Sequence, residues 1–405
     1  MTGIDYLCSS RIEPMSIYAR RGVSAQKEEV HQAIRQLDQG LYPHAFCKMY
    51  PDFAGGDPNF VNIMHADGAG TKSILAYLYW KETGDVSVWK GIARDAVAMN
   101  LDDLLCVGVT DNLLFSSTID RNKLLIGGDI LEAVIEGTRA YFQLLAEYGV
   151  NIHYLGGETA DVGDVVRTIA VNGTMMARWP TSKIISNQQI APGQVIVGLS
   201  SSGTCAYEPA YNSGLGSNGL TSARHDVLSK YYATQFPESF EPGLSEEVIY
   251  VGHHRLTDHY TIAGVQHTIG ELLLSPTRTY APVICQLLRE FADDVKGMIH
   301  CSGGGQTKCM KYLPRPMQVV KDNLFQPPPI FSLIQDNSGA DDREMYQVFN
   351  MGHRMEIFTE ESAAGKMIDL AAQFGVEAKV VGKVLPSDKK ELTLQLPEKT
   401  IHFEY

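Results

Sequence analysis

The sequence has little that would place the protein in a membrane, in an oxidising compartment or on nucleic acid. Its 405 residues include only seven cysteines and no CxxC pair, so neither a disulfide framework nor a zinc ribbon is expected. Its apolar runs, such as residues 74–80, are too short to cross a bilayer, and the N-terminus does not resemble a signal peptide. With 34 basic against 47 acidic residues, the net charge of -13 disfavours general binding to nucleic acid or anionic membranes. We therefore expect a cytoplasmic protein.

The composition is that of an ordinary globular protein, with 44% hydrophobic and 20% charged residues. At roughly 100–200 residues per domain, the length predicts two or three domains. A polar segment bounded by proline and glycine covers residues 180–193 and is typical of a linker. We therefore predict an N-terminal domain over residues 1–185 and a C-terminal domain over residues 190–405.

Strand-like and helix-like segments alternate in both halves of the chain. A period of 3.6 predicts helices at residues 71–80, 280–291 and 365–374, and a long helix that Asp129 caps and Gly149 ends. Short apolar runs and alternation predict strands at residues 61–65, 152–155, 168–178, 195–199, 299–301 and 380–384. The fold class is therefore α/β or α+β, since periodicity alone does not choose between them.

Residues 65–72, with the sequence HADGAGTK, join a strand end to a helix start. Gly68 and Gly70 allow the main chain to approach a ligand closely, and the N-terminus of the following helix favours an anion. Lys72 is a candidate for holding a phosphate and Asp67 for holding the cation beside it. The spacing is that of neither a Walker loop nor a Rossmann fingerprint, so a plain tight turn is an equally good interpretation of this motif alone.

The second cluster consists of Asp95, Asn100, Asp102 and Asp103 in an apolar helical segment. Asp95 and Asp102 are seven residues apart, which places them on one helix face. Carboxylates among apolar residues are costly unless they pair or bind a metal, and magnesium prefers oxygen ligands. The alternative is a helix whose acidic residues face water.

Four further clusters combine glycine with small polar or charged residues. Each is compatible with contacts to phosphate or hydroxyl oxygens, and each is also compatible with an ordinary turn or loop. Three consecutive glycines before a helix make the last of them a stronger candidate for anion binding. The clusters are residues 156–159 (GGET), 200–203 with 215–220 (SSSG and LGSNGL), 275–278 (SPTR) and 300–306 (HCSGGGQ).

Taken in order, these six clusters resemble the aminoimidazole ribonucleotide synthetase family, also called phosphoribosylformylglycinamidine cyclo-ligase. The PPPIF stretch at residues 327–331 and the MYQVFNMG stretch at residues 345–352 resemble this family more than its superfamily relatives. The resemblance implies two α/β domains, the first of which dimerises through a barrel-like sheet. It also implies ATP and Mg²⁺ as cofactors, a small phosphoribosyl substrate, and no nucleic-acid or membrane partner. The implied enzyme converts formylglycinamidine ribonucleotide to aminoimidazole ribonucleotide, ADP and phosphate.

The resemblance also assigns roles to residues. Asp95 and Lys72 are implied to be catalytic, and Asp67, Asp95 and Glu158 are implied to hold the metal. The positions that match the family's ATP site are Asp67, Gly68, Gly70, Thr71, Lys72, Asn100, Asp103, Gly156, Gly157 and Glu158. The positions that match its substrate site are Ser217, Asn218, Gly219, Thr277, Arg278, Gly303, Gly304 and Gly305.

The chain departs from the family pattern at several places, one of them near the N-terminus, where Arg20 or Arg21 stands in for a lysine that the family tends to have after a tyrosine. Gly216 stands where the family usually has a histidine, which puts the proton-transfer step in question rather than ATP binding. Residues 204–214, with Tyr207 and Glu208, are an insertion, and residues 231–270 are longer than the family implies. Two alternatives are a superfamily enzyme that acts on another amide or acid and a silent nucleotide-binding paralogue. The retained acidic residues argue against the silent protein, and the two C-terminal stretches argue against the other substrate.

Overall fold

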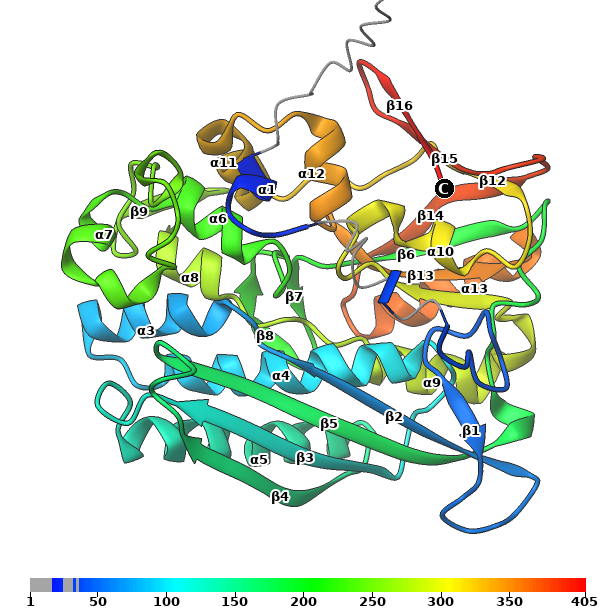
Figure 1. Cartoon of the computed structure of the whole chain (residues 1–405). Helices are drawn as coiled ribbons and strands as arrows, with labels where there is room; N and C mark the ends of the chain where they lie inside the picture. Colours follow the sequence, from blue (N-terminus) through cyan, green and yellow to red (C-terminus); the bar gives the residue numbers. More distant parts are fainter. Residues whose placement is uncertain (1–16, 25–31, 34–35) are drawn as a thin grey trace, which may run out of the picture.

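The computed structural model describes residues 17–24, 32–33 and 36–405. The other residues of the predicted first domain, including Cys8, lie outside this part of the chain. Two large mixed β-sheets, one from each half of the chain, organise the fold, and helices pack on both (Figure 1). The predicted class, a mixture of helices and strands in each half, is confirmed. Within the described ranges, no helix has the length and apolar character needed to span a membrane.

The first sheet has five strands in the order β1-β2-β5-β3-β4. Its neighbours pair antiparallel except β3 and β4, which are parallel. Helix α4 packs on β2 and β5, and α5 and α3 pack on α4. The strands are β1 (Met49–Pro51), β2 (Phe60–Gly68), β3 (Leu113–Arg121), β4 (Ile152–Asp161) and β5 (Ile169–Pro180). The helices are α3 (Lys72–Thr83), α4 (Val88–Leu105) and α5 (Gly128–Glu147).

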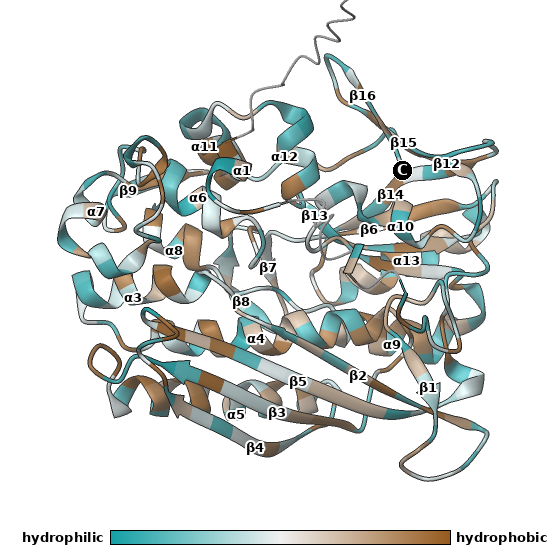
Figure 2. Cartoon of the chain, viewed as in Figure 1, coloured by the Kyte–Doolittle hydropathy of each residue, from teal (hydrophilic) through white to brown (hydrophobic). Residues whose placement is uncertain are grey.

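Among the described residues, helices pack on only one face of this sheet. Strand β5 buries every second side chain, including Val171 and Met175, as its alternating sequence predicts. Its other face points away from α3, α4 and α5 in Figure 1, and Figure 2 shows apolar stretches on the strands that face the viewer. Met64 on β2 and Leu155 on β4 are each 63% exposed. The sheet therefore presents apolar side chains that no described part of the chain covers.

The second sheet has seven strands in the order β11-β13-β6-β14-β12-β15-β16. All its neighbours pair antiparallel except β12 and β15. Strands β6 and β13 are buried along their whole length, since helices and loops cover both faces at the centre of the sheet. The strands are β6 (Val195–Ser200), β11 (Gly297–His300), β12 (Met317–Lys321), β13 (His353–Thr359), β14 (Ala378–Leu385), β15 (Lys390–Gln395) and β16 (Thr400–Glu404).

The remaining elements surround the second sheet. The insertion at residues 204–214 forms most of the hairpin β7 (Gly203–Cys205) and β8 (Glu208–Asn212). The long segment at residues 231–270 holds a helix and the hairpin β9 (His259–Ile262) and β10 (Val265–Thr268). The helices are α1 (Ile17–Arg20), α6 (Leu220–Val227), α7 (Tyr231–Gln235), α8 (Ile269–Leu274), α9 (Ala281–Phe291), α10 (Lys308–Tyr312), α11 (Pro329–Ser338), α12 (Asp342–Val348) and α13 (Glu361–Gln373).

Most predicted elements are confirmed within a few residues, and two details are wrong. Gly127, rather than Asp129, is the N-cap of α5, and Asp129 lies in the first turn of that helix. The strand predicted at residues 152–155 continues to Asp161, so Gly156, Gly157 and Glu158 lie inside β4 rather than in a turn after it. The segment of residues 181–194 connects the two sheets, and the exact domain boundary within it stays a prediction.

Candidate functional site

Lys72 and Asp95 form a buried ion pair where the two halves of the chain meet. Their side chains have no exposed surface, and Lys72 Nζ lies 2.9 Å from Asp95 Oδ1. The second half contributes both neighbouring contacts, because Lys72 Nζ donates to the Ser275 carbonyl oxygen at 2.5 Å and the Thr277 amide donates to Asp95 Oδ1 at 2.6 Å. Burial lowers the pKa of Lys72 from its ordinary value, although the charge of Asp95 opposes this shift. The second oxygen of Asp95, Oδ2, is buried without a hydrogen-bond partner.

A hydrogen bond from the Asn100 side chain to the backbone holds the end of β2 against α4. Asn100 donates through Nδ2 to the Asp67 carbonyl oxygen at 3.0 Å, and Asp67 Oδ1 accepts from the Gly68 amide at 2.7 Å. A side chain at Gly68 would place its Cβ 2.1 Å from Asn172 Oδ1 on β5, so the sheet itself requires glycine there. Asp67 is half-buried and lies on the element next to α4, which carries Asp95.

Asp103 connects the two sheets through two histidines. Its Oδ2 lies 3.0 Å from His65 Nε2 on β2, and its Oδ1 lies 2.6 Å from His300 Nδ1 on β11. Burial alone would raise the pKa of Asp103, but the hydrogen bonds from His300 and His65 outweigh it and hold the pKa below its ordinary range. Neither histidine was singled out as a site residue from the sequence, although each begins one of the motifs.

The hydrogen bonds of His65 indicate that its ring carries both protons. Asn100 uses its Nδ2 atom as a donor, so its Oδ1 atom, 3.2 Å from His65 Nδ1, must accept from the ring. The other ring nitrogen donates to Asp103. Burial would lower the pKa of His65, but these contacts with Asp103 and Asn100 raise it above its ordinary value. His65 and Asp103 therefore form an imidazolium–carboxylate pair.

The predicted substrate-side residues come from three loops that the structure brings together. Ser217 Oγ lies 2.7 Å from Thr277 Oγ1. Asn218 faces the glycine loop, since a Cβ added at Gly303 would lie 3.6 Å from Asn218 Oδ1. Gly303, Gly304 and Gly305 all have left-handed backbone angles, so this loop depends on glycine. Gly219 has a similar angle and begins α6.

Arg278 is buried with its guanidinium bonded inside the protein. Its Nε donates to Glu208 Oε2 at 2.8 Å, and its two Nη atoms donate to the carbonyl oxygens of Ser202 and Gly203 at 2.7 and 2.5 Å. Glu208 also pairs with Arg94 at 2.9 Å. The insertion at residues 204–214 thus supplies a carboxylate that neutralises two arginines. All three nitrogens of Arg278 already donate within the protein, so a phosphate contact would have to use the N–H group of Nη2 that remains, and that contact stays a prediction.

Glu158 lies apart from the other candidates within one chain. It is exposed on β4, and β5 and β3 lie between β4 and β2, so about 14 Å separates the two strands at the usual spacing of about 4.8 Å. Gly157 beside it pairs closely with β3, because an added Cβ would lie 1.8 Å from the Ser117 carbonyl oxygen. The predicted metal ligands Asp67, Asp95 and Glu158 do not form a group of three. Within the described ranges, the only such group of histidine, cysteine and acidic residues is Cys301, His353 and Glu356.

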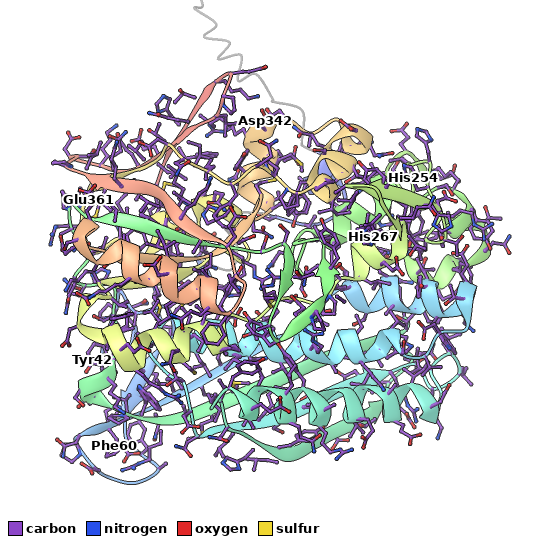
Figure 3. All side chains as sticks on the ribbon, turned by 180° about the vertical axis from the view of Figure 1, so that it is seen from behind. Tyr42, Phe60, His254, His267, Asp342 and Glu361 are labelled. Atoms are coloured by element: carbon purple, nitrogen blue, oxygen red, sulfur yellow. The ribbon has the colours of Figure 1, made fainter. Side chains whose placement is uncertain are left out.

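The group of Cys301, His353 and Glu356 is better explained as a buried ion-pair network than as a metal site. Glu356 Oε1 lies 2.5 Å from Lys321 Nζ and 2.9 Å from His353 Nε2. Burial would raise the pKa of Glu356, but Lys321 and His353 lower it to about 2. A cation already neutralises this carboxylate. The helices α3 and α4 lie between the first sheet and the second half of the chain, as the view from behind shows (Figure 3).

Two family models match the chain in sequence. Residues 55–179 match the N-terminal domain of AIR synthase related protein, and residues 191–395 match the C-terminal domain. The chain is 30% identical over 325 residues to the phosphoribosylformylglycinamidine cyclo-ligase of Methanocaldococcus jannaschii, covering 80% of this chain and 78% of that protein. It is 28% identical to the protein of that name from Methanococcus vannielii, and the match covers 85% of this chain and 82% of that protein. It is 27% identical to the protein of that name from Alkaliphilus metalliredigens, and the match covers 82% of each.

Solved structures share the fold at low sequence identity. Thermotoga maritima PurL complexed with ADP aligns with a TM-score of 0.55 and 12% identity over 97% of this chain and 51% of that chain. The chain thus spans about half the length of that protein. A chain of a HypE–HypF complex aligns with a TM-score of 0.53 and 14% identity, and the alignment covers 94% of this chain and 99% of that chain. AaThiL complexed with AMPPCP and TMP aligns with a TM-score of 0.51 and 9% identity, and the alignment covers 93% of this chain and 94% of that chain.

Proposed function

Because the chain belongs to the AIR synthase related family, we propose that it is an ATP-dependent cyclo-ligase of purine biosynthesis. Its substrate would be formylglycinamidine ribonucleotide and its products aminoimidazole ribonucleotide, ADP and phosphate. Curated relatives that carry the cyclo-ligase name support this proposal, since they are 26–30% identical over about four fifths of the chain. Two chains of the same fold were solved with ADP and AMPPCP, which supports an ATP site.

The observation that carries the proposal is a continuous set of contacts between motifs far apart in sequence. Lys72 contacts Asp95, Asp95 accepts from the Thr277 amide, and the Thr277 hydroxyl contacts Ser217. Thr71 Oγ1 also lies 2.9 Å from Thr221 Oγ1, which joins the start of α3 to α6. The residues assigned to nucleotide and to substrate therefore adjoin each other, as transfer of a phosphoryl group between two ligands requires.

The chemistry begins with an amide oxygen that is a poor leaving group. The γ-phosphoryl group moves from ATP to this formyl oxygen, so the P–O bond to ADP breaks and a P–O bond to the amide oxygen forms. The amidine nitrogen then attacks the activated carbon, loses its proton, and the C–O bond breaks with release of phosphate. In such reactions the protein positions the two ligands and neutralises the charge of the phosphoryl group.

Two of the three predicted ligands fit a magnesium ion. Mg²⁺ is usually held by one or two carboxylates together with substrate phosphates, and it would neutralise charge on those phosphates when bound. Asp67 and Asp95 lie on adjacent elements, and the buried Oδ2 atom of Asp95 has no hydrogen-bond partner. We assign these two residues to the metal. Glu158 is too far along the sheet to join them without a second chain or the ligand itself.

We also propose a homodimer through the uncovered face and outer edge of the five-stranded sheet. Met64 and Leu155 are large apolar side chains exposed on this surface, and β4 is an edge strand with unpaired backbone groups. A second copy that packs here would cover both. Such a dimer would also place Glu158, on β4, at the seam between the two chains.

We place the enzyme in the cytoplasm, where its thiols would stay reduced. All cysteines among the described residues are free and buried, namely Cys47, Cys106, Cys205, Cys285, Cys301 and Cys309. Burial raises the pKa of Cys47 and Cys106 well above the ordinary value, so these thiols stay protonated and unreactive.

The proposal is tested with purified protein, ATP, Mg²⁺ and formylglycinamidine ribonucleotide. We expect aminoimidazole ribonucleotide, detected by its diazo colour, together with ADP and phosphate in equal amounts. Measurable ATP binding without this product would contradict the assigned substrate. The Asp95→Asn variant tests the metal assignment and is expected to abolish turnover, so full activity in that variant would refute it.

A further inference from the structure

Arg354, on β13, has a guanidinium nitrogen without a partner in the middle of the candidate site. The residue is only 2% exposed. Its Nε donates to His300 Nε2 at 3.1 Å, and its Nη2 donates to the Arg278 carbonyl oxygen and lies 3.7 Å from Asp102 Oδ2. Its Nη1 atom is buried and makes no hydrogen bond. A buried charged donor without an acceptor is costly, so its persistence suggests that a ligand supplies the acceptor.

The unpartnered Nη1 atom occupies the space beside Gly216. A Cβ atom added at Gly216 would lie 2.9 Å from Arg354 Nη1, so no side chain could stand there without moving the guanidinium. Gly216 directly precedes Ser217 and Asn218, which were assigned to the substrate from the sequence. The absence of a side chain at position 216 therefore lets a cation from β13 reach the substrate loop.

Arg354 differs from the two other cations in the site. Lys72 is bonded to Asp95 and to the Ser275 carbonyl oxygen. Arg278 uses all three of its nitrogens on Glu208 and on backbone oxygens. Among these three cations, Arg354 alone has a nitrogen atom that makes no hydrogen bond. Because the guanidinium is always protonated and planar, it suits an anionic oxygen such as that of a phosphoryl group.

We propose that Arg354 binds the phosphoryl group on the substrate side of the site, through its Nη1 atom. This inference rests on the proposed function, in which the formyl amide oxygen of the substrate receives a phosphoryl group. Arg354 would donate a hydrogen bond to an oxygen of that group as it is transferred and as it leaves as phosphate. It would not move a proton, because its guanidinium stays protonated throughout.

His300 and Asp103 position this arginine. His300 Nδ1 donates to Asp103, which leaves His300 Nε2 to accept from Arg354 Nε. Asp102, whose pKa is raised by burial, lies on the other side of the guanidinium. The guanidinium is therefore fixed by neighbours on two elements, with only Nη1 directed at the loop of Gly216. The Arg354 guanidinium would therefore not have to change its position when an anion binds at Nη1.

The test compares Arg354→Ala and Arg354→Lys with the unaltered enzyme. Removing a donor to a developing anion typically lowers kcat by about 100-fold or more, and we expect that loss in Arg354→Ala with little change in the KM for ATP. Added guanidinium chloride at non-denaturing concentration is expected to restore part of the kcat. Arg224→Ala, which removes another buried arginine bonded to Ser239 and Tyr250, is the matched control and should not respond to guanidinium.

A second measurement does not depend on turnover. Inorganic phosphate is expected to raise the Tm of the unaltered protein and to raise it less in Arg354→Ala, while the shift produced by ATP is retained. Gly216→Ala keeps the arginine but places a methyl group against Nη1, and it should weaken the phosphate shift in the same way. Undiminished kcat in Arg354→Ala, or an equal phosphate shift in it, would overturn the inference. If the unaltered protein forms no product, the proposed function fails, and the phosphate shift still decides the role of Arg354.

Discussion

Single residues in the site carry charges that the fold has to neutralise internally. Lys72 and Asp95 have no exposed surface, and each would be costly to bury alone. Asp103 lies between two histidines, and Glu356 lies between a lysine and a histidine. Charges of opposite sign are therefore matched within a few ångströms throughout the site. This matching makes two predictions at the scale of the residue.

The first prediction concerns the Lys72–Asp95 pair. Removing one partner of a buried pair typically costs about 3–5 kcal/mol, so we expect a loss of this size in the free energy of unfolding of Lys72→Met. The double variant Lys72→Met/Asp95→Asn should recover most of the loss, because it removes the unpaired carboxylate and keeps an acceptor for the Thr277 amide. Urea unfolding measures the free energy of unfolding of the single and the double variant. Equal stability of the single and double variants would contradict a charge-based role for the pair.

The second prediction concerns the pH dependence of the His65–Asp103 pair. The pKa of His65 is raised in the folded protein, so its contribution to stability is fully present below its unfolded pKa and is lost as the pH rises through its folded pKa. The pKa of Asp103 is lowered, so its contribution is present above its unfolded pKa and is lost as the pH falls. The difference in the free energy of unfolding between the unaltered protein and His65→Gln should therefore shrink as the pH rises through the folded pKa of His65. A difference that grows with pH would exclude the imidazolium at His65.

At the scale of the element, the strands of the first sheet approach one another so closely that certain positions must be glycine. Gly157 on β4 faces the backbone of β3, and Gly68 on β2 faces Asn172 on β5. These two glycines were selected from the sequence as ligand-binding positions. Their first role in the structure is to let the strands pair.

Gly157→Ala is therefore expected to destabilise the first sheet. Its Cβ would lie 1.8 Å from the Ser117 carbonyl oxygen, and overpacking of this kind typically costs about 1–3 kcal/mol. Gly365→Ala in α13 is the control, since no atom lies within 4 Å of its added Cβ and alanine is favoured in a helix by roughly 0.5–1 kcal/mol. Thermal unfolding should give opposite changes in Tm for the two variants. A shift in the same direction would argue against close strand contact.

At the scale of the whole molecule, one face of the first sheet is left uncovered by the described residues of a single chain. The helices α3, α4 and α5 cover only the opposite face (Figure 1). Met64 and Leu155 lie on strands at opposite sides of the sheet, β2 and β4, so the apolar character extends across it. We expect this surface to be covered by a second copy.

The dimer prediction is tested by sedimentation of the unaltered protein and of Met64→Glu and Leu155→Glu. A charge placed in a dimer interface is desolvated without a partner, so both variants should sediment as monomers at concentrations where the unaltered protein is a dimer. Val265→Glu on β10 is the control, because Val265 is similarly exposed at 57% but belongs to a hairpin in the second half of the chain. A dimer that survives in both sheet variants would place the interface elsewhere.

The pattern of the sequence was sufficient for the family and for those elements with a clear period, but other elements, such as β3 and β12, were not predicted. The amphipathic period identified α5 and α9, and alternation identified β5, because local periodicity determines which face of an element is buried. It was insufficient for β13, whose residues are all buried, since His353, Arg354 and Glu356 do not look like core residues. Charged side chains enter a core only with partners, and those partners lie on other elements.

The sequence by itself therefore determined the strands and helices that have a clear period and the order of the motifs, because these depend on neighbours along the chain. Only the tertiary structure decided which charges meet: that Lys72 pairs with Asp95, that Asp103 lies between His65 and His300, and that Glu158 stays apart from them. It also decided that Arg354 reaches the space beside Gly216, which lies more than a hundred residues away in the chain. The physical reason is that the cost of burying a charge is set by what surrounds it in space, and the sequence does not state those distances.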